Sequence, residues 1–160
     1  MGFHIMGVLI PLIILLPNLL FMLYPPKDMP GQKEKEPLWL TVLENIGRII
    51  CFLYPIVFGV DVSNAIRLNS ALPYVMALCI LAYYCLWARY FIHGRRFALL
   101  FRPLFFLPIP MAVFPALYFL ALSILLQSLI MGVAAAIFAA SHIALSRKTY
   151  RQLQKDGSAV

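Results

Sequence analysis

The sequence predicts an all-α integral membrane protein with five transmembrane helices, its N-terminus outside and its C-terminus in the cytoplasm. Composition is the first reason: 63% of the 160 residues are apolar and only 12% are charged, whereas an ordinary soluble domain is roughly a quarter charged. The apolar residues also fall into long blocks, and the basic residues flank these blocks. We therefore expect residues 1–160 to form a single transmembrane helical domain with no soluble domain.

Three apolar blocks are each long enough to cross a bilayer, because a spanning helix needs about 20 mostly apolar residues. They cover residues 2–24, 38–60 and 71–90. The next apolar stretch, residues 97–146, is too long for one crossing and suits two. We place the turn of this hairpin at Gln127 and Ser128, which gives spans at residues 111–127 and 129–145.

Residues 97–110 lead into the fourth span and contain Pro103, Pro108 and Pro110. Proline lacks an amide hydrogen and its ring clashes with the preceding helical turn, so this segment is not expected to form one continuous helix. Two interpretations stay open. The segment is either an interfacial elbow along the headgroups or a broken, re-entrant helix covered by the rest of the protein.

The basic residues predict the orientation, because Lys and Arg accumulate on the cytoplasmic side of short loops. With the N-terminus outside, eleven of the 13 fall on the cytoplasmic side and only Arg67 falls outside. The remaining one, Arg48, lies within the second span. An even number of crossings would scatter these charges over both faces. We therefore expect five spans in the cytoplasmic (plasma) membrane and a basic cytoplasmic tail at residues 146–160, with Trp39 and Trp87 as interface anchors.

The second span carries the most informative polar residues: Glu44, Asn45 and Arg48. Ionisable groups inside a span are costly and usually face a protein interior or a water-filled cavity. Glu44 and Arg48 are four residues apart on a helix and can form an ion pair. Gly47 would let another backbone approach beside them. The pair is either structural, fixing how helices pack, or it lines a polar pocket for a solute.

Two polar residues on other spans share the depth of Glu44. By helical rise, Asn18, Glu44 and His142 each lie within roughly 8 to 11 Å of the cytoplasmic boundary. We predict that Asn18, Glu44, Asn45, Arg48 and His142 form a solute-binding pocket open to the cytoplasm. The alternative is a set of separate hydrogen bonds between helices. His142 could also move protons, since histidine changes charge near neutral pH.

The sequence contains no recognised catalytic, metal or cofactor motif. Cys51, Cys79 and Cys85 form no CxxC pair, and neither HExxH nor a glycine-rich phosphate loop is present. We therefore assign no catalytic residue, no metal site and no cofactor, and leave open whether the protein is an enzyme.

The leading functional hypothesis is a membrane protein that binds or transports an ion or a small polar or amphiphilic solute. A second is a membrane-embedded enzyme acting on a lipid or isoprenoid, with His142 and Glu44 in acid–base roles. A third is a non-catalytic partner subunit. The expected partners are the bilayer, an unknown solute or lipid, and a homodimer or membrane-protein partner, but no nucleic acid. A stripe of small residues, Gly132, Ala136 and Ala140, would serve packing within the chain or a homodimer seam.

Overall fold

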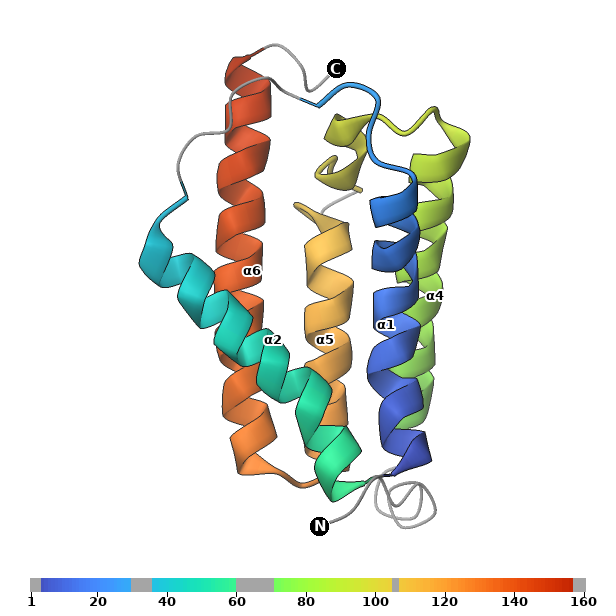
Figure 1. The fold of residues 1–160 in the computed structure, drawn as a ribbon, viewed down its shortest axis with the longest axis vertical. Helices are drawn as coiled ribbons and strands as arrows, with labels where there is room; N and C mark the ends of the chain where they lie inside the picture. The colour runs from blue at the N-terminus through green and yellow to red at the C-terminus, as the bar shows by residue number, and fades with distance from the viewer. Residues whose placement is uncertain (1–3, 30–35, 60–70, 105–106, 157–160) are drawn as a thin grey trace.

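The computed structural model describes residues 4–29, 36–59, 71–104 and 107–156, and these form an upright bundle of α-helices with no strand in the described ranges (Figure 1). The elements are α1 (Ile5–Leu23), α2 (Leu38–Phe58), α4 (Ala71–Ile92), the short 3₁₀ helix η1 (Phe97–Leu100), α5 (Pro110–Leu125) and α6 (Leu129–Lys155). The predicted all-helical class is therefore confirmed for the described residues.

Four of these helices are long and apolar enough to cross a membrane: α1, α2, α4 and α6. They have 19, 21, 22 and 27 residues, so at 1.5 Å per residue the shortest spans about 29 Å, close to the hydrocarbon thickness. Helix α5 has 16 residues, which corresponds to about 24 Å. The protein is thus membrane-embedded, but α5 alone is shorter than the bilayer core.

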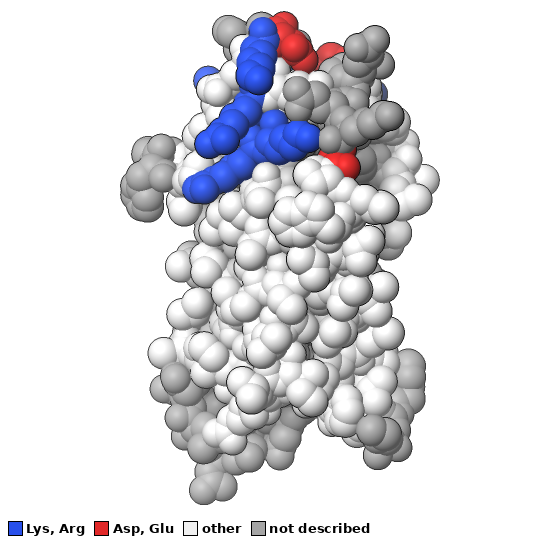
Figure 2. All heavy atoms as spheres, turned by 90° about the vertical axis from the view of Figure 1, so that its left-hand side faces the viewer, with Lys and Arg blue, Asp and Glu red and all other residues white. Residues whose placement is uncertain are grey.

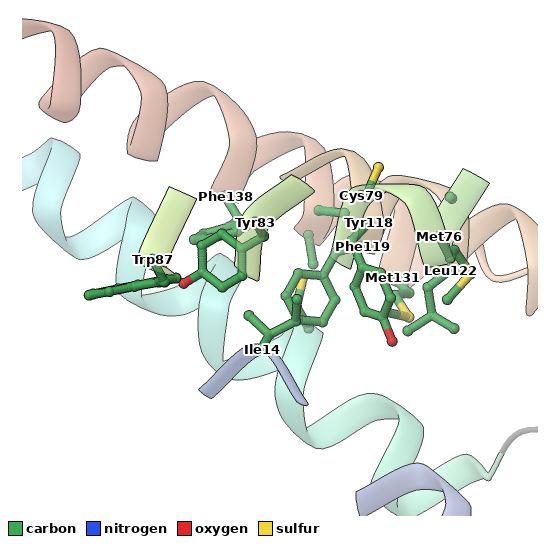
Figure 3. Packing of buried hydrophobic residues seen from close by; sticks show 14 of the residues in the cluster. Ile14, Met76, Cys79, Tyr83, Trp87, Tyr118, Phe119, Leu122, Met131 and Phe138 are labelled. Carbon is green, nitrogen blue, oxygen red and sulfur yellow. The ribbon is translucent and has the colours of Figure 1, made fainter. Parts of the chain in front are cut away.

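The bundle is organised around α5, which packs between α4 and α6. Helix α2 crosses obliquely against α6, and α1 packs against α2 and α4 (Figure 1). The core residues come from all five helices (Figure 3). Those almost fully enclosed include Cys51, Tyr90, Phe119, Leu122 and Met131. Close packing of these side chains sets the distances between helices, and therefore which polar side chains can meet.

Much of the outer surface of the bundle is apolar. Large side chains such as Leu9 on α1, Ile49 on α2 and Leu78 on α4 are exposed. On the face shown in Figure 2, charged side chains gather at one end, above an uncharged belt. An apolar belt of this kind would be unfavourable in water and is favourable when lipid is the solvent.

The segment before α5 does not continue as a helix. After η1, Leu104 and Leu107 exchange backbone hydrogen bonds. Ile109, between two prolines, has φ +88°, an unusual value for a β-branched residue. Side chains hold the segment in place: Arg89 donates to the Leu99 carbonyl at 2.9 Å, and Asp28 accepts from the Phe97 amide at 2.6 Å. The prolines therefore interrupt the helical backbone, and polar contacts to neighbouring elements hold the segment before α5 in position.

Three details add to or differ from the sequence-based expectations. Helix α6 continues to Lys155, so it includes most of the predicted basic tail as well as the predicted span at residues 129–145; Arg, Gln and Lys have high helix propensity. Trp87 is not an interface anchor: only 6% of it is exposed, and it packs against Phe21 and Tyr90. The small-residue stripe is divided: Ala136 and Ala140 are exposed, whereas Gly132 is half-buried and lies beside Ser123 of α5.

Candidate functional site

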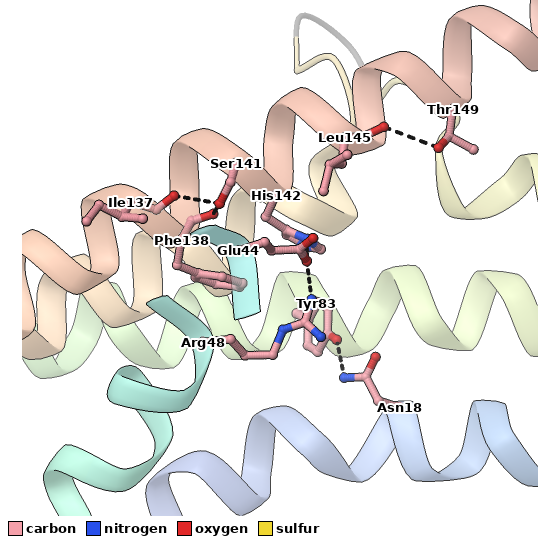
Figure 4. Close-up of polar contacts among 10 residues, drawn as sticks. All are labelled: Asn18, Glu44, Arg48, Tyr83, Ile137, Phe138, Ser141, His142, Leu145 and Thr149. Atoms are coloured by element: carbon pink, nitrogen blue, oxygen red, sulfur yellow. Dashed lines mark hydrogen bonds and ion pairs between the residues drawn. The ribbon is translucent and has the colours of Figure 1, made fainter. Parts of the chain in front are cut away.

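Glu44 and Arg48 form an ion pair one helical turn apart on α2 (Figure 4). The Glu44 side chain is 10% exposed and that of Arg48 is 40% exposed. Four residues on one helix bring two side chains to the same face. The pair expected from the sequence is therefore present, with its acid buried and its base half open.

His142 on α6 is the third member of this cluster. Its Nδ1 lies 2.8 Å from Oε1 of Glu44, the same oxygen that Arg48 contacts. The carboxylate thus links α2 to α6. When His142 donates from Nδ1 to Glu44, its Nε2 is left as an acceptor, because a neutral imidazole has one donor and one acceptor nitrogen.

Gly47 explains why the two helices come close enough for this contact. A Cβ added at Gly47 would lie 2.8 Å from the Phe138 amide nitrogen and 2.9 Å from the Ala134 carbonyl oxygen, both on the α6 backbone. The absence of a side chain at Gly47 therefore allows the close approach that places Glu44 beside His142.

Phe138 lies one turn before His142 and contacts two members of the cluster. Its ring stacks on the His142 ring, with centroids 5.1 Å apart and planes 16° apart. The Arg48 guanidinium lies 5.9 Å from the centroid of the same ring. This single aromatic side chain therefore orients the imidazole and supplies a cation–π contact to the arginine.

A second polar contact, between Asn18 on α1 and Tyr83 on α4, lies nearby (Figure 4). Asn18 Nδ2 donates to the Tyr83 hydroxyl at 3.0 Å and to the Ile14 carbonyl at 3.0 Å. Tyr83 is buried. The adjacent Tyr84 instead donates to the Ile13 carbonyl at 2.8 Å. Two neighbouring tyrosines on α4 thus each form a hydrogen bond to a different residue of α1.

Three cavities meet at His142. One, of about 250 Å³, is lined by Glu44 and His142 and continues toward the basic end along Thr149 and Gln152. A second, of about 190 Å³, lies deeper and is lined by Arg48, Asn18 and Tyr83 as well as His142. A third, of about 200 Å³, lies between His142, Tyr83 and the segment that contains Leu100 and Phe101. The cluster is therefore bordered by hollow space, with Glu44 on one side and Arg48 on the other.

Of the five predicted binding residues, the structure brings Arg48 and His142 into direct contact with Glu44, and it places Asn18 on a cavity that Arg48 and His142 also line. It does not bring Asn45 to the cluster. Asn45 is exposed, because consecutive residues point about 100° apart around a helix.

Sequence reasoning missed several apolar members of the site. Phe97, Leu100 and Phe101 line the cavities beside His142, and Phe138 stacks on its ring. The proline-rich composition of residues 97–110 indicated an irregular segment that could pack against the rest of the protein. The sequence pattern did not indicate which cavity this segment lines. Among the described residues, no group of three His, Cys, Asp or Glu side chains could hold a metal ion.

No family model, curated protein or solved structure matches this chain. The class follows from the molecule itself: a membrane-embedded helical bundle with a partly buried Glu–Arg–His cluster bordered by cavities.

Proposed function

We propose that this protein binds, and moves, an ion or a small polar or amphiphilic solute through the pocket around Glu44, Arg48 and His142. One observation carries the proposal: Arg48 and His142 both contact Glu44, and each of the three lines a cavity rather than a sealed seam. A cluster that served packing alone would gain nothing from hollow space on two sides, because unfilled space costs contacts.

The chemistry of the pocket indicates the kind of solute. Glu44 can hold a cation or proton, and Arg48 can hold an anionic group. Phe101, Trp87 and Leu100 give one cavity an apolar wall. A pocket with both charges and aromatic walls suits a solute that has a polar head and an apolar body.

The proposal includes five crossings of the cytoplasmic membrane, with the N-terminus outside. Helix α5 supports the fifth crossing, because it packs beside α6 and joins it through residues 126–128. The irregular residues before α5 would make up the thickness that its 16 residues lack. Nine described basic residues at one end of the bundle support the orientation: Lys27, Arg89, Arg95, Arg96, Arg102, Arg147, Lys148, Arg151 and Lys155.

A thermal-shift screen of the purified protein tests the pocket. The probes are inorganic ions, small organic acids and zwitterions, and single-chain amphiphiles, and a probe that raises the melting temperature is then followed by counterflow in proteoliposomes. Glu44→Gln and Arg48→Ala should abolish both the shift and the flux. Asn45→Ala is the matched control, because Asn45 is exposed on the same turn of α2, and it should behave as the wild type. An unchanged shift in folded Glu44→Gln would remove this site assignment.

A second candidate, an enzyme acting on a lipid or isoprenoid, is favoured by the contact between His142 and Glu44. A carboxylate that accepts from Nδ1 orients an imidazole whose Nε2 can act as a general base. The test is product formation from phospholipid or isoprenyl diphosphate by the purified protein, with His142→Asn as the inactive variant. Turnover that survives in His142→Asn would exclude this role for the histidine.

A further inference from the structure

The outer face of the second half of α6 carries a feature that the pocket does not use. A hollow of about 580 Å³ runs along this face, bordered at one end by Ala140, Ile143 and Ala144 and at the other by basic side chains. The basic side chains are Arg147, Lys148, Arg151 and Lys155. They form a connected group directly above an uncharged surface (Figure 2).

We propose that this face of α6 is a binding site for an anionic phospholipid. The phosphate lies against Arg147 and Arg151, and one acyl chain runs along Ala140 and Ala144. Both arginines are exposed, and among the described residues neither forms an ion pair. Their guanidinium groups have the planar, forked geometry that binds phosphate oxygens in pairs.

The spacing along α6 matches the layers of a bilayer. Twenty residues from Leu129, about 30 Å of helix, reach Lys148. Arg147 and Arg151 are separated by about 6 Å along the axis, which is close to the depth of one headgroup layer. The two arginines therefore lie where phosphates lie, and the two alanines lie where acyl chains begin.

The small side chains below the arginines form the part of the site that would hold the acyl chain. Ala140 and Ala144 are exposed and one turn apart, so they leave a shallow path along the helix that larger residues would fill. General attraction of a basic end to the membrane needs no such path. A lipid site differs from scattered surface charge because it combines a groove for an acyl chain with a pair of arginines that bind the phosphate.

Native mass spectrometry tests the proposal. The full-length protein in detergent is offered equal amounts of phosphatidylglycerol and phosphatidylcholine with identical chains. The wild type should prefer phosphatidylglycerol, and Arg147→Gln/Arg151→Gln should lose roughly thirtyfold of this preference, since each basic group near the surface contributes about fivefold to the affinity. Arg96→Gln/Arg102→Gln removes the same charge from exposed positions at the same end and should keep the preference. An equal loss in both double variants would overturn the site, because only the general field would then attract the lipid.

Two further measurements separate this lipid site from other occupants. Ala144→Phe fills the path without changing the charge and should weaken phosphatidylglycerol binding; unchanged binding would overturn the acyl half of the site. Excess inorganic phosphate should not displace the lipid, and displacement would show that the arginines bind a soluble anion instead. A dimer in the mass spectrum that dissociates in Ala144→Phe would show that a second copy covers this face, which would also overturn the proposal.

Discussion

Gly47 on α2 lies against the α6 backbone at Phe138, so that a Cβ at position 47 would meet the Phe138 amide nitrogen at 2.8 Å. The contact lies one turn from both Glu44 and His142. It determines how far apart the two helices stand, and therefore whether the carboxylate reaches the imidazole.

Gly47→Ala should destabilise the protein by about 1 to 3 kcal/mol, because the atoms in the way belong to a backbone that can move only with its helix. Gly132→Ala is the matched control. Among the described residues, a Cβ there would meet only the Ser123 side chain, at 3.5 Å from its hydroxyl, and alanine gains up to about 1 kcal/mol of helix propensity over glycine. Thermal unfolding in detergent measures both. Equal stability of the two variants would contradict the role assigned to Gly47.

The contact between Glu44 and His142 should appear as an energetic coupling. In a double-mutant cycle of Glu44→Gln and His142→Ala, we expect a coupling of about 0.5 to 3 kcal/mol, the range for groups in direct contact. The same cycle with Asn45→Ala in place of Glu44→Gln should be additive within about 0.5 kcal/mol, because Asn45 faces away. Denaturant unfolding in mixed micelles gives both values, and additivity in the first cycle would show that the contact does not stabilise the bundle.

Tyr83 and Tyr84 separate pocket function from helix packing. Each hydroxyl bonds to α1, and a hydrogen bond between helices in a membrane is worth about 0.6 kcal/mol. Tyr83→Phe and Tyr84→Phe should therefore lose similar, small amounts of stability. Only Tyr83 lines the cavities that His142 also lines, so only Tyr83→Phe should weaken the thermal shift by a bound probe. The same weakening in Tyr84→Phe would indicate an effect of packing.

The proposed orientation predicts which end reacts with an impermeant maleimide on intact cells. Leu129→Cys, at the start of α6, should be labelled from outside, whereas Gln154→Cys near its end should be labelled only after permeabilisation. Both positions are exposed. The background is Cys85→Ala, because Cys51 and Cys79 are buried. Protection of Leu129→Cys together with labelling of Gln154→Cys would reverse the orientation.

The helices could be predicted from the sequence because membrane spans depend on local composition. The range predicted as residues 71–90 became Ala71–Ile92, and Glu44 with Arg48 share a face by spacing alone. The end of α6 at Lys155 was not predicted, because hydropathy marks where a helix leaves the hydrocarbon and not where its hydrogen bonding stops.

The site was harder to predict because it depends on which helix faces which. Depth placed Glu44 and His142 in one layer, but their contact joins residues 98 positions apart. Neither span's sequence indicates which other helix it packs against. Asn45 was predicted as part of the pocket because it neighbours Glu44 in sequence. Consecutive helical residues point about 100° apart, however, and Asn45 is exposed on the outer surface. Trp87 was assigned to the interface by residue type, but aromatic neighbours on α1 and α4 bury it.

The short connection between α5 and α6 bears on how the chain would enter a membrane during synthesis. Only residues 126–128 separate the two helices, and Ser128 already caps the second by accepting from the Met131 amide at 3.2 Å. A 16-residue helix preceded by irregular backbone is a weak insertion signal by itself. The longer partner that follows, which alone is long enough to cross the bilayer, would have to draw it in, so the translocation machinery would handle the two as one hairpin.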